Sequence, residues 1–491
     1  MRLKESKSAA VIKSPNGIQQ MEFKGREEDT NLMTGKQQKK QLKLPLNWER
    51  KGEAKTAPGE GTEPDVVACE PGIPVPESLM EEVASALNLK EAYLEVRANG
   101  GAPGIDGMTV NQLDDYIAKH REKLSQRLMD GTFVPRPVKR VEIEKPGGGT
   151  RKLGIPCVID RLVQQAILRV VQRYTDDTFS ESSFGFRPNR SAHDAIRTAQ
   201  EYVRNGFTWV IDIDLEKFFD RVNHDILMSL VAKRFKDKRL LKLIRAFLNA
   251  GVMENGLVTE QEEGTPQGGP LSPWLSNVML DELDKELEKR NLSFARYADD
   301  CNIYVQSERA GLRVMASITK FLSKKLRLTV NAQKSAVGRP WERKFLGFTF
   351  TRKELKIAVS PVALVRAKDR IRELTKRKRG GSKTEIFREL AQYLNGWRGY
   401  YEVAETKGTF QELDKWLRRR LRALLWHRWR TPKARYKELI KHGVSPTLAA
   451  CTAGSSKGTW HLSLGQALSI ALPISYFTDR GIPILAARRG T

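Results

Sequence analysis

Hydrophobic and polar residues alternate strictly along Trp209–Asp214, which predicts a β-strand with two unlike faces. Tryptophan and isoleucine side chains fall on one face, and the other face carries Val210, Asp212 and Asp214. Two carboxylates on one strand face are costly to bury unless that face is wet or binds a metal ion. The segment therefore predicts a strand with one face in a hydrophobic core and an acidic site on the other face.

A second stretch, Phe294–Val305, predicts two short strands joined by a turn at Ala298, Asp299 and Asp300. Aromatic and β-branched residues on both sides of the turn suit a half-buried hairpin. At a turn both carboxylates can reach one site, and a bound divalent cation would remove their mutual repulsion. Asp is also favoured in turns for backbone reasons alone, so a plain polar turn is the alternative at this point.

The rest of the pattern alternates helices with short strands, which is typical of an α+β fold. Apolar residues at helical spacing predict a first helix that Ser78 can cap, and Ser445–Gly458 is expected to be a loop. Further expected helices are Leu89–Ala98, Leu275–Leu287 and Ala310–Leu326, and the further expected strands are the hairpin Val138–Ile155, Leu328–Lys334 with a basic loop, and Phe345–Phe350.

The chain has 491 residues and a formal net charge of +26. An excess of this size favours nucleic acid as the partner over a merely basic surface. The four cysteines lie far apart without CxxC spacing, which excludes a cysteine zinc site and a disulfide framework and indicates an intracellular setting. The longest apolar run is too short to span a bilayer, so we expect a soluble cytoplasmic protein without a membrane partner. Residues 1–75 lack periodic hydrophobicity and predict a disordered or loosely ordered leader.

Two loops combine basic residues with the geometry that nucleotides or nucleic acids need. Lys145 and Arg151 flank the glycine-rich tip of the hairpin Val138–Ile155, where they suit a polyphosphate, although a solvated hairpin explains them equally. The loop Ser183–Ser191 interleaves aromatic and arginine side chains that suit a single-stranded template. Core aromatics with solvated arginines explain this second loop almost as well. The four side chains in question are Phe184, Phe186, Arg187 and Arg190.

Two later segments have the same character. In Gly264–Pro273, glycines allow close approach of a ligand, the following helix N-terminus favours phosphate, and Gln267 offers a neutral donor and acceptor. From about Pro361 the chain becomes helical and basic. Solvated basic helices are the ordinary interpretation of such a composition, but the dense mixture of aromatics and arginines around Trp397, Arg398 and Tyr400 favours nucleic acid.

The acidic residues suit nucleotidyl transfer, which needs two divalent ions about 3.5–4 Å apart to hold the attacking hydroxyl and the leaving phosphate in line. Mg²⁺ takes few carboxylates together with phosphate oxygens and waters. Asp214 from a strand, with Asp299 and Asp300 from a hairpin, could supply that set. Phe219 follows Asp214 by five positions. Its ring could pack under the sugar of an incoming nucleotide and crowd a 2′-hydroxyl, which would favour deoxynucleotides.

In their order along roughly residues 76–440, these motifs resemble those of group II intron-encoded reverse transcriptases/maturases of the bacterial type. Phe294–Val305 resembles the catalytic YADD motif. Asp214–Asp220 resembles the first metal-binding motif, and this match is the reason to choose Asp214 over Asp212. The remaining matches are Ser183–Arg190, Thr265–Pro273 at the nucleotide pocket, Phe345–Phe348, and Trp397–Tyr401 in the maturase-specific thumb, or X, domain.

The resemblance implies a right-hand polymerase with fingers, a palm built on an antiparallel sheet, and a helical thumb. It divides the chain into the leader (1–75), fingers with an N-terminal extension (76–208), a palm with some fingers elements (209–355), the thumb/X domain (356–432) and a C-terminal DNA-binding-like tail (433–491).

The resemblance also implies roles for individual residues. Asp214, Asp299 and Asp300 would be catalytic and, with Leu215, would hold two Mg²⁺ ions, for which Mn²⁺ could substitute. The nucleotide-binding set would be Lys145, Arg151, Phe219, Gln267 and Lys334. The RNA-binding or template-binding set would be Phe184, Phe186, Arg187, Arg190, Trp397, Arg398 and Tyr400.

The implied function is an RNA-directed DNA polymerase that copies intron RNA into DNA at the insertion site, in target-primed retrohoming, and assists intron splicing. Its partners would be the intron RNA, as a ribonucleoprotein, target DNA and deoxynucleoside triphosphates. Only Cys451, His442 and His461 lie near the C-terminus, so no HNH endonuclease is expected, and priming from an existing DNA 3′ end is favoured. The alternatives are a non-catalytic RNA-binding splicing factor and a reverse transcriptase of a retron, diversity-generating element or defence system. The sequence leaves the oligomeric state open.

Overall fold

Strand β3 (Trp209–Ile213) occupies a central position in a sheet with the strand order β6-β7-β3-β8. It pairs antiparallel with β7 (Asp300–Val305) and with β8 (Ala336–Gly338), and β6 (Ser293–Tyr297) forms the predicted hairpin with β7. The computed structural model describes residues 75–144, 150–254, 257–259, 263–265, 268–377 and 380–487, with only the backbone of Glu144 and Arg151. Except for its last residue, the expected leader lies outside these ranges.

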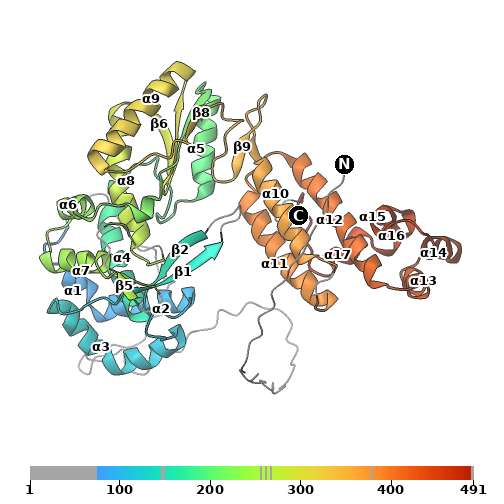
Figure 1. Ribbon diagram of the computed structural model, residues 1–491, viewed down its shortest axis with the longest axis horizontal. Helices are drawn as coiled ribbons and strands as arrows, with labels where there is room; N and C mark the ends of the chain where they lie inside the picture. The colour runs from blue at the N-terminus through green and yellow to red at the C-terminus, as the bar shows by residue number, and fades with distance from the viewer. Residues whose placement is uncertain are drawn as a thin grey trace, which may run out of the picture. The chain divides into compact units, whose positions relative to one another are not determined.

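The two faces of the β3 sheet belong to different hydrophobic cores. The alternation predicted a core on one face only, and this expectation is wrong because α5 and later helices also pack on the face that carries Val210. Ile211 and Ile303 pack in the first core, and Val210 and Tyr304 pack in the second. Figure 1 shows the sheet with α9 on one side and α5 on the other. The first core includes α4 (Val158–Thr175), α6 (His224–Arg234), α8 (Ser272–Lys289) and α9 (Glu308–Phe321), and the second includes α5 (Ala192–Arg204), α10 (Pro361–Leu374), α11 (Lys383–Tyr401) and α12 (Lys407–Arg428).

A second sheet has the order β2-β1-β4-β5. Strands β1 (Val138–Glu144) and β2 (Thr150–Ile155) form the predicted antiparallel hairpin, and β4 (Val252–Glu254) runs parallel to β1. Mixed helices and sheets of this kind confirm the α+β fold class. The remaining elements are α1 (Met80–Val83), α2 (Ala86–Asn99), η1 (Val110–Gln112), α3 (Leu113–Met129), η2 (Asp176–Thr178), η3 (Phe218–Asp220), α7 (Lys238–Leu248), β5 (Leu257–Thr259), the π-helical η4 (Leu322–Leu326), β9 (Phe348–Phe350) and β10 (Ile357–Val359).

Two local expectations from the sequence are wrong. Ser78 does not cap the first helix, because Leu79 is the N-cap of α1 and it is the Ser85 hydroxyl that accepts the Asn88 N–H at the start of α2. The expected strand Leu328–Lys334 is reduced to one bridge between Val330 and Leu215. Both segments have apolar residues at the right spacing, and tertiary contacts decide where the regular hydrogen bonding begins.

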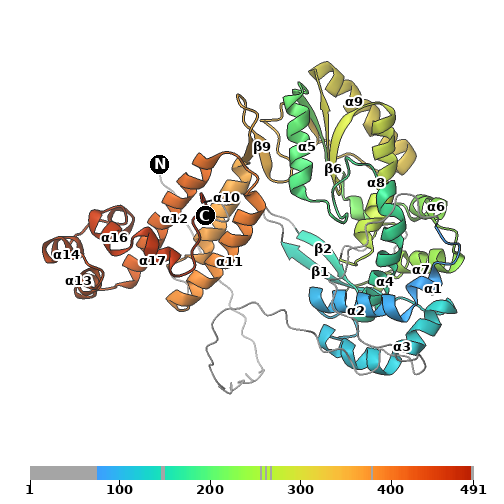
Figure 2. The ribbon, with the colours of Figure 1, turned by 180° about the vertical axis from the view of Figure 1, so that it is seen from behind.

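The C-terminal residues are more helical than the sequence predicts. Part of the expected loop Ser445–Gly458 forms a helix, because Pro446 suits a first helical turn and Ala449 and Ala453 share a buried face. Helices α13, α14 and α16 contact one another beyond the end of α12 (Figures 1 and 2). These C-terminal helices are α13 (Pro432–Lys441), α14 (Pro446–Ala453), α15 (Thr459–Leu462), α16 (Gln466–Ala471) and α17 (Ile474–Thr478).

The last described segment returns to the helices α11 and α12. The buried carboxylate of Asp414 on α12 accepts the backbone N–H groups of Leu485 and Ala486, each at 3.0 Å. Arg398 on α11 donates to the carbonyl of Ala487. One carboxylate and one guanidinium therefore fasten the segment Leu485–Ala487 to the helices. Among the residues that the structure describes, every helix is too short or too polar to pass through a bilayer.

We expect Asp414→Ala to release this C-terminal segment. Two buried N–H groups would lose a charged acceptor, so the free energy of unfolding should fall by about 1.5–3 kcal/mol. Limited proteolysis should then cut after Ile482 faster than in the wild type. Asp414→Asn keeps one acceptor oxygen and is the matched control, with a smaller expected loss. Equal cleavage rates in the Ala variant and the wild type would contradict the role of this carboxylate.

Candidate active site

The sheet brings the predicted acidic residues from distant parts of the chain to one place. Ile213 pairs with Cys301 at the end of the β3–β7 ladder. Asp214 follows directly after this last pair and lies close enough to Asp300 for its charge to raise the pKa of Asp300. Asp299 precedes Asp300 in the hairpin turn, so Asp214, Asp299 and Asp300 gather at one edge of the sheet.

The turn that carries Asp299 has a constrained backbone. Tyr297 pairs with Asp300, which leaves Ala298 and Asp299 as a two-residue loop. Ala298 has a φ of 59°, a left-handed conformation that costs a non-glycine residue on the order of 1 kcal/mol. The backbone of Gly185 passes so close that a Cβ atom there would lie 2.3 Å from the Ala298 nitrogen. The surrounding chain therefore holds the turn in this conformation.

The acidic cluster carries a strong electrostatic cost. Burial, together with Asp212, Asp299 and Asp214, raises the pKa of Asp300 to about 8. Burial also raises the pKa of Asp212, although Arg343 counters this by binding its carboxylate at 2.6 Å. Because Asp212 already has a guanidinium partner, Asp214 is the strand carboxylate left for another cation. This geometry independently favours Asp214 over Asp212.

The residues present fit a divalent cation, although no three described His, Cys, Asp or Glu side chains form a tight metal-binding group. One carboxylate oxygen of Asp214, Oδ2, is buried and accepts no hydrogen bond, with the ammonium of Lys334 3.3 Å away. Burial and three neighbouring carboxylates raise the pKa of Asp300, and Lys344 offsets this only in part. Carboxylate oxygens are the ligands that hard divalent cations take, so the cluster has the chemistry of such a site.

A cavity of about 500 Å³ is lined by residues of α2, α4 and the start of α8. Phe219 forms part of its wall, as do the residues Gly268–Pro270 that lead into α8, and this volume is sufficient for a nucleotide. Two contacts fix the position of Phe219. Its ring packs edge-on against Phe218, and its carbonyl accepts the Thr265 N–H at 2.7 Å. Lys145 and Gln267 lie outside the described residues, as does the side chain of Arg151.

A smaller cavity of about 250 Å³ connects the acidic turn with the helices that follow the sheet. Asp300 contributes to its wall, together with Lys344, Arg366 on α10 and Tyr393 on α11. Arg343, Lys344 and Arg366 were given no role at this site from the sequence. Arg343 and Lys344 directly precede the block Phe345–Phe348, and that position is the signal that would have found them.

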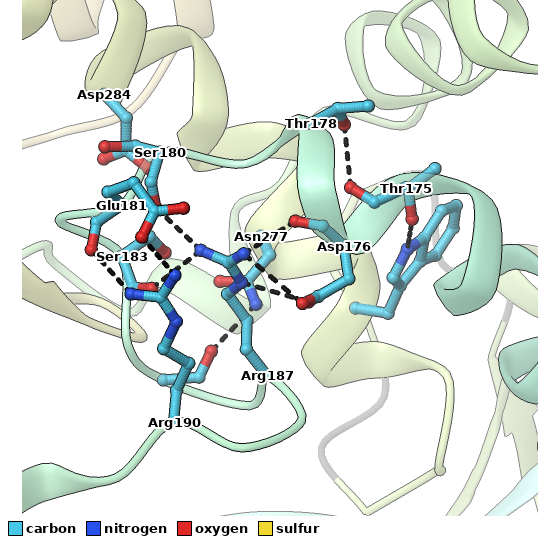
Figure 3. A network of polar contacts seen from close by, with 12 residues as sticks. Thr175, Asp176, Thr178, Ser180, Glu181, Ser183, Arg187, Arg190, Asn277 and Asp284 are labelled. Carbon is cyan, nitrogen blue, oxygen red and sulfur yellow. Dashed lines mark hydrogen bonds and ion pairs between the residues drawn. The ribbon is translucent and has the colours of Figure 1, made fainter. Parts of the chain in front are cut away.

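The predicted RNA-binding residues fall into two groups. Phe184 and Trp397 pack in the second core, and only 2% of the Arg187 side chain is exposed. The Arg187 guanidinium binds Asp176 and the carbonyls of Ser180 and Ser183 (Figure 3). Direct contact with RNA does not fit these three interior positions, because each side chain already has partners within the protein. The other four residues are at least partly exposed, and their contacts with RNA remain predictions. They are Phe186, Arg190, Arg398 and Tyr400.

Two family descriptions match consecutive parts of the chain. Residues 143–350 match "Reverse transcriptase (RNA-dependent DNA polymerase)". Residues 364–443 match "Group II intron, maturase-specific domain". The first match contains the acidic cluster, and the second contains α11 and α12 in full. The smaller cavity is therefore lined by both matched segments.

Two curated relatives match about two fifths of the chain. Protein YkfC of Escherichia coli (strain K12) is 40% identical over 222 residues, which are 44% of this chain and 56% of YkfC. Group II intron-encoded protein LtrA of Lactococcus lactis subsp. cremoris is 36% identical over 206 residues, which are 42% of this chain and 34% of LtrA. The match thus spans little more than half of YkfC and a third of LtrA. A chain of the solved "Partial Cas6-RT-Cas1--Cas2 complex" is 23% identical with a TM-score of 0.33, over 50% of this chain and 43% of that one. At that TM-score the likeness carries no functional argument.

We expect the metal-free protein to lose stability between about pH 5 and pH 8. The folded protein holds a proton on Asp300 up to a pKa of about 8, whereas the unfolded chain releases it near pH 4. The stabilising contribution is thus complete below pH 4 and is lost as the pH rises through 8. Asp300→Asn cannot ionise, so its melting temperature should fall less over this range when both proteins are measured in chelator. Parallel pH profiles of the two proteins would contradict the raised pKa.

Proposed function

Because this chain belongs to the group II intron-encoded reverse transcriptases/maturases, we propose that it copies intron RNA into DNA and assists the splicing of that RNA. The observation that carries the proposal is the meeting of Asp214 with Asp299 and Asp300 within the segment that matches the reverse-transcriptase description. Copying would occur at the insertion site on a DNA primer, as in target-primed retrohoming.

In this proposal, Asp214, Asp299 and Asp300 hold two Mg²⁺ ions, with the backbone of Leu215 beside them, and Mn²⁺ can replace Mg²⁺. When bound, such ions activate the primer hydroxyl and neutralise charge on the leaving pyrophosphate. The protein itself positions the reactants. Phe219 supports the sugar of the incoming nucleotide in the large cavity, a position that its place in the cavity wall supports.

The triphosphate would be bound by Lys145 and Arg151 of the β1–β2 hairpin, by Gln267, and by Lys334. The ammonium of Lys334 lies 3.3 Å from Asp214 in the absence of a metal ion, so it is within reach of whatever binds there. Polyphosphates need several such donors at once. The proposed division into fingers (76–208), palm (209–355), thumb/X domain (356–432) and DNA-binding-like tail (433–491) follows from these roles.

The partners we propose are the intron RNA, held as a ribonucleoprotein, the target DNA and deoxynucleoside triphosphates, in the cytoplasm. The maturase-specific match supports the RNA partner. The basic helices support it as well, since α10 and α12 present exposed basic side chains such as Arg370 and Lys415. The acidic cluster disfavours a splicing factor without polymerase activity. Burying Asp300 among other carboxylates lowers stability, and such a factor would gain no function from that arrangement.

We expect Asp299→Asn to abolish primer extension on an RNA template while leaving RNA affinity unchanged. The variant removes a proposed metal ligand, so the rate should fall by more than the roughly 10–100-fold that the loss of an outer-shell partner costs. Primer extension with Mg²⁺ and a filter-binding assay with the same RNA measure the two properties. Asp225→Asn alters an exposed carboxylate on α6 and is the matched control. Wild-type protein that fails to extend a well-annealed primer would reject the proposed function.

We expect Phe219→Val to weaken the discrimination against ribonucleotides. A smaller side chain would leave room for a 2′-hydroxyl in the cavity that Phe219 lines. Steric differences of this size change kcat/KM ratios by about 10-fold or more. The ratio of kcat/KM for a deoxynucleotide to that for the matching ribonucleotide, on one template position, gives the measurement. An unchanged ratio would show that Phe219 does not contact the sugar.

A further inference from the structure

A complete ion pair is buried beneath the acidic turn. Arg296 on β6 and Asp284 on α8 are both fully buried. The Arg296 guanidinium donates from Nε to Asp284 Oδ1 at 2.7 Å and from Nη2 to Asp284 Oδ2 at 2.5 Å. Burying two charges costs about as much free energy as their attraction returns, so stability alone is a weak reason for the pair. Its other contacts indicate a more specific role.

Every N–H group of the Arg296 guanidinium has an acceptor. Beyond Asp284, Nη1 donates to the carbonyl of Ala298 and to Asn277 Oδ1, each at 3.0 Å, and Nη2 donates to the hydroxyl of Ser183 at 2.7 Å. A guanidinium has five N–H donors in a fixed plane, and all five are used here. The carbonyl of Ala298 belongs to the peptide that leads directly into Asp299, so Arg296 holds the turn itself.

Asn277 on α8 holds the other side of the same turn. Its amide Nδ2 donates to the carbonyl of Gly185 at 2.8 Å, while its Oδ1 accepts from Arg296. Gly185 is the residue whose backbone presses against the nitrogen of Ala298. The backbone of Arg296 also exchanges hydrogen bonds with the loop, since it accepts the Phe184 N–H and donates to Ser182. The turn is thus fixed from β6, from α8 and from the loop.

The loop has its own support from behind. Figure 3 shows the polar contacts of Arg187 with Asp176 and with the loop that carries Ser183. Arg187 donates to the carbonyl of Ser183 at 3.0 Å and is itself paired with Asp176. Ser183 therefore receives an arginine at its carbonyl and another at its hydroxyl. This explains why Arg187 points inward, and it connects Arg187 to the turn through Ser183 and Arg296.

We propose that Arg296, together with Asn277, is a positioning residue that fixes the peptide between Ala298 and Asp299 and so orients the Asp299 and Asp300 carboxylates for metal binding. The inference rests on the proposed polymerase function but assigns residues that the motifs did not. The left-handed conformation of Ala298 persists only where the surroundings over-determine it, and Arg296 and Gly185 supply that constraint. Arg296 touches neither nucleotide nor metal, so its role is indirect.

The test compares two arginines that both pair with α8. Arg296→Lys keeps a positive charge for Asp284 but loses the planar set of donors, including the bond to Ala298. Arg234 pairs with Asp281 on the same helix without contacting the turn, so Arg234→Lys is the matched control. The readouts are the melting temperature, kcat and KM in primer extension, and the Mg²⁺ concentration for half-maximal rate.

We expect Arg296→Lys to lower kcat by about 10–100-fold, to raise the Mg²⁺ requirement and to leave the KM for the nucleotide unchanged. Arg234→Lys should lower the melting temperature comparably without these kinetic changes. Unaltered kcat and Mg²⁺ dependence in folded Arg296→Lys would overturn the proposal. An equal loss of activity in the two variants would do so too, because it would indicate a general effect on folding.

Two further measurements keep the inference testable. If Arg296→Lys does not fold, Asn277→Ala leaves the Arg296–Asp284 pair intact, and the same loss of kcat and rise in Mg²⁺ requirement are expected. If the wild type does not extend primers, the proposed function fails, but the rise in melting temperature on adding Mg²⁺ still reports metal binding. That rise should be smaller in Asn277→Ala than in Arg234→Lys, and equal rises would overturn the positioning role.

Discussion

The turn that carries Asp299 and Asp300 can bind a metal ion only if its backbone conformation is fixed. In this chain the buried guanidinium of Arg296 fixes it through the carbonyl of Ala298. Arg296 satisfies Asp284, Asn277 and the Ala298 carbonyl at once, so the turn, β6 and α8 cannot shift independently. The free-energy cost of burying the Arg296 charge is offset because Asp284 is buried beside it. The acidic site, the hairpin and the packing of α8 against the sheet therefore depend on one network of polar contacts.

The negative charges of Asp212, Asp214 and Asp300 are partly compensated by cations of the segment 334–344. Lys334 reaches Asp214 and Arg343 binds Asp212, while Lys344 acts on Asp300 from the smaller cavity. The balance is incomplete, since the pKa of Asp300 stays raised. Arg343 donates two hydrogen bonds to one oxygen of Asp212, whereas Asp214 faces the ammonium of Lys334, whose side chain is 66% exposed. A divalent ion would complete this balance at the position where the protein's own compensation is weakest.

The sequence predicted what periodicity and turn chemistry control. Alternation along Trp209–Asp214 predicted the strand and the shared face of its two acids, but not that Val210 on the same face packs in a second core. Periodicity could not show which arginines turn inward: Arg187 and Arg296 occupy interior positions that only tertiary partners reveal. The helix that starts at Pro446 was missed for a related reason, because its few buried alanines give little apolar signal before the neighbouring helices are known.

The polymerase and maturase segments share their interiors as well as a cavity. Val210 and Tyr304 from the sheet pack in the same core as Leu390 and Leu394 from α11. The hydroxyl of Tyr400 donates to the carbonyl of Leu346, and the His193 ring lies 2.6 Å from the carbonyl of Tyr400. Removal of the maturase-specific helices would expose one face of the β3 sheet and open the cavity beside Asp300. The physical unit that supports the acidic turn is therefore larger than the reverse-transcriptase segment, and changes in α10 and α11 can reach Asp300 through direct packing.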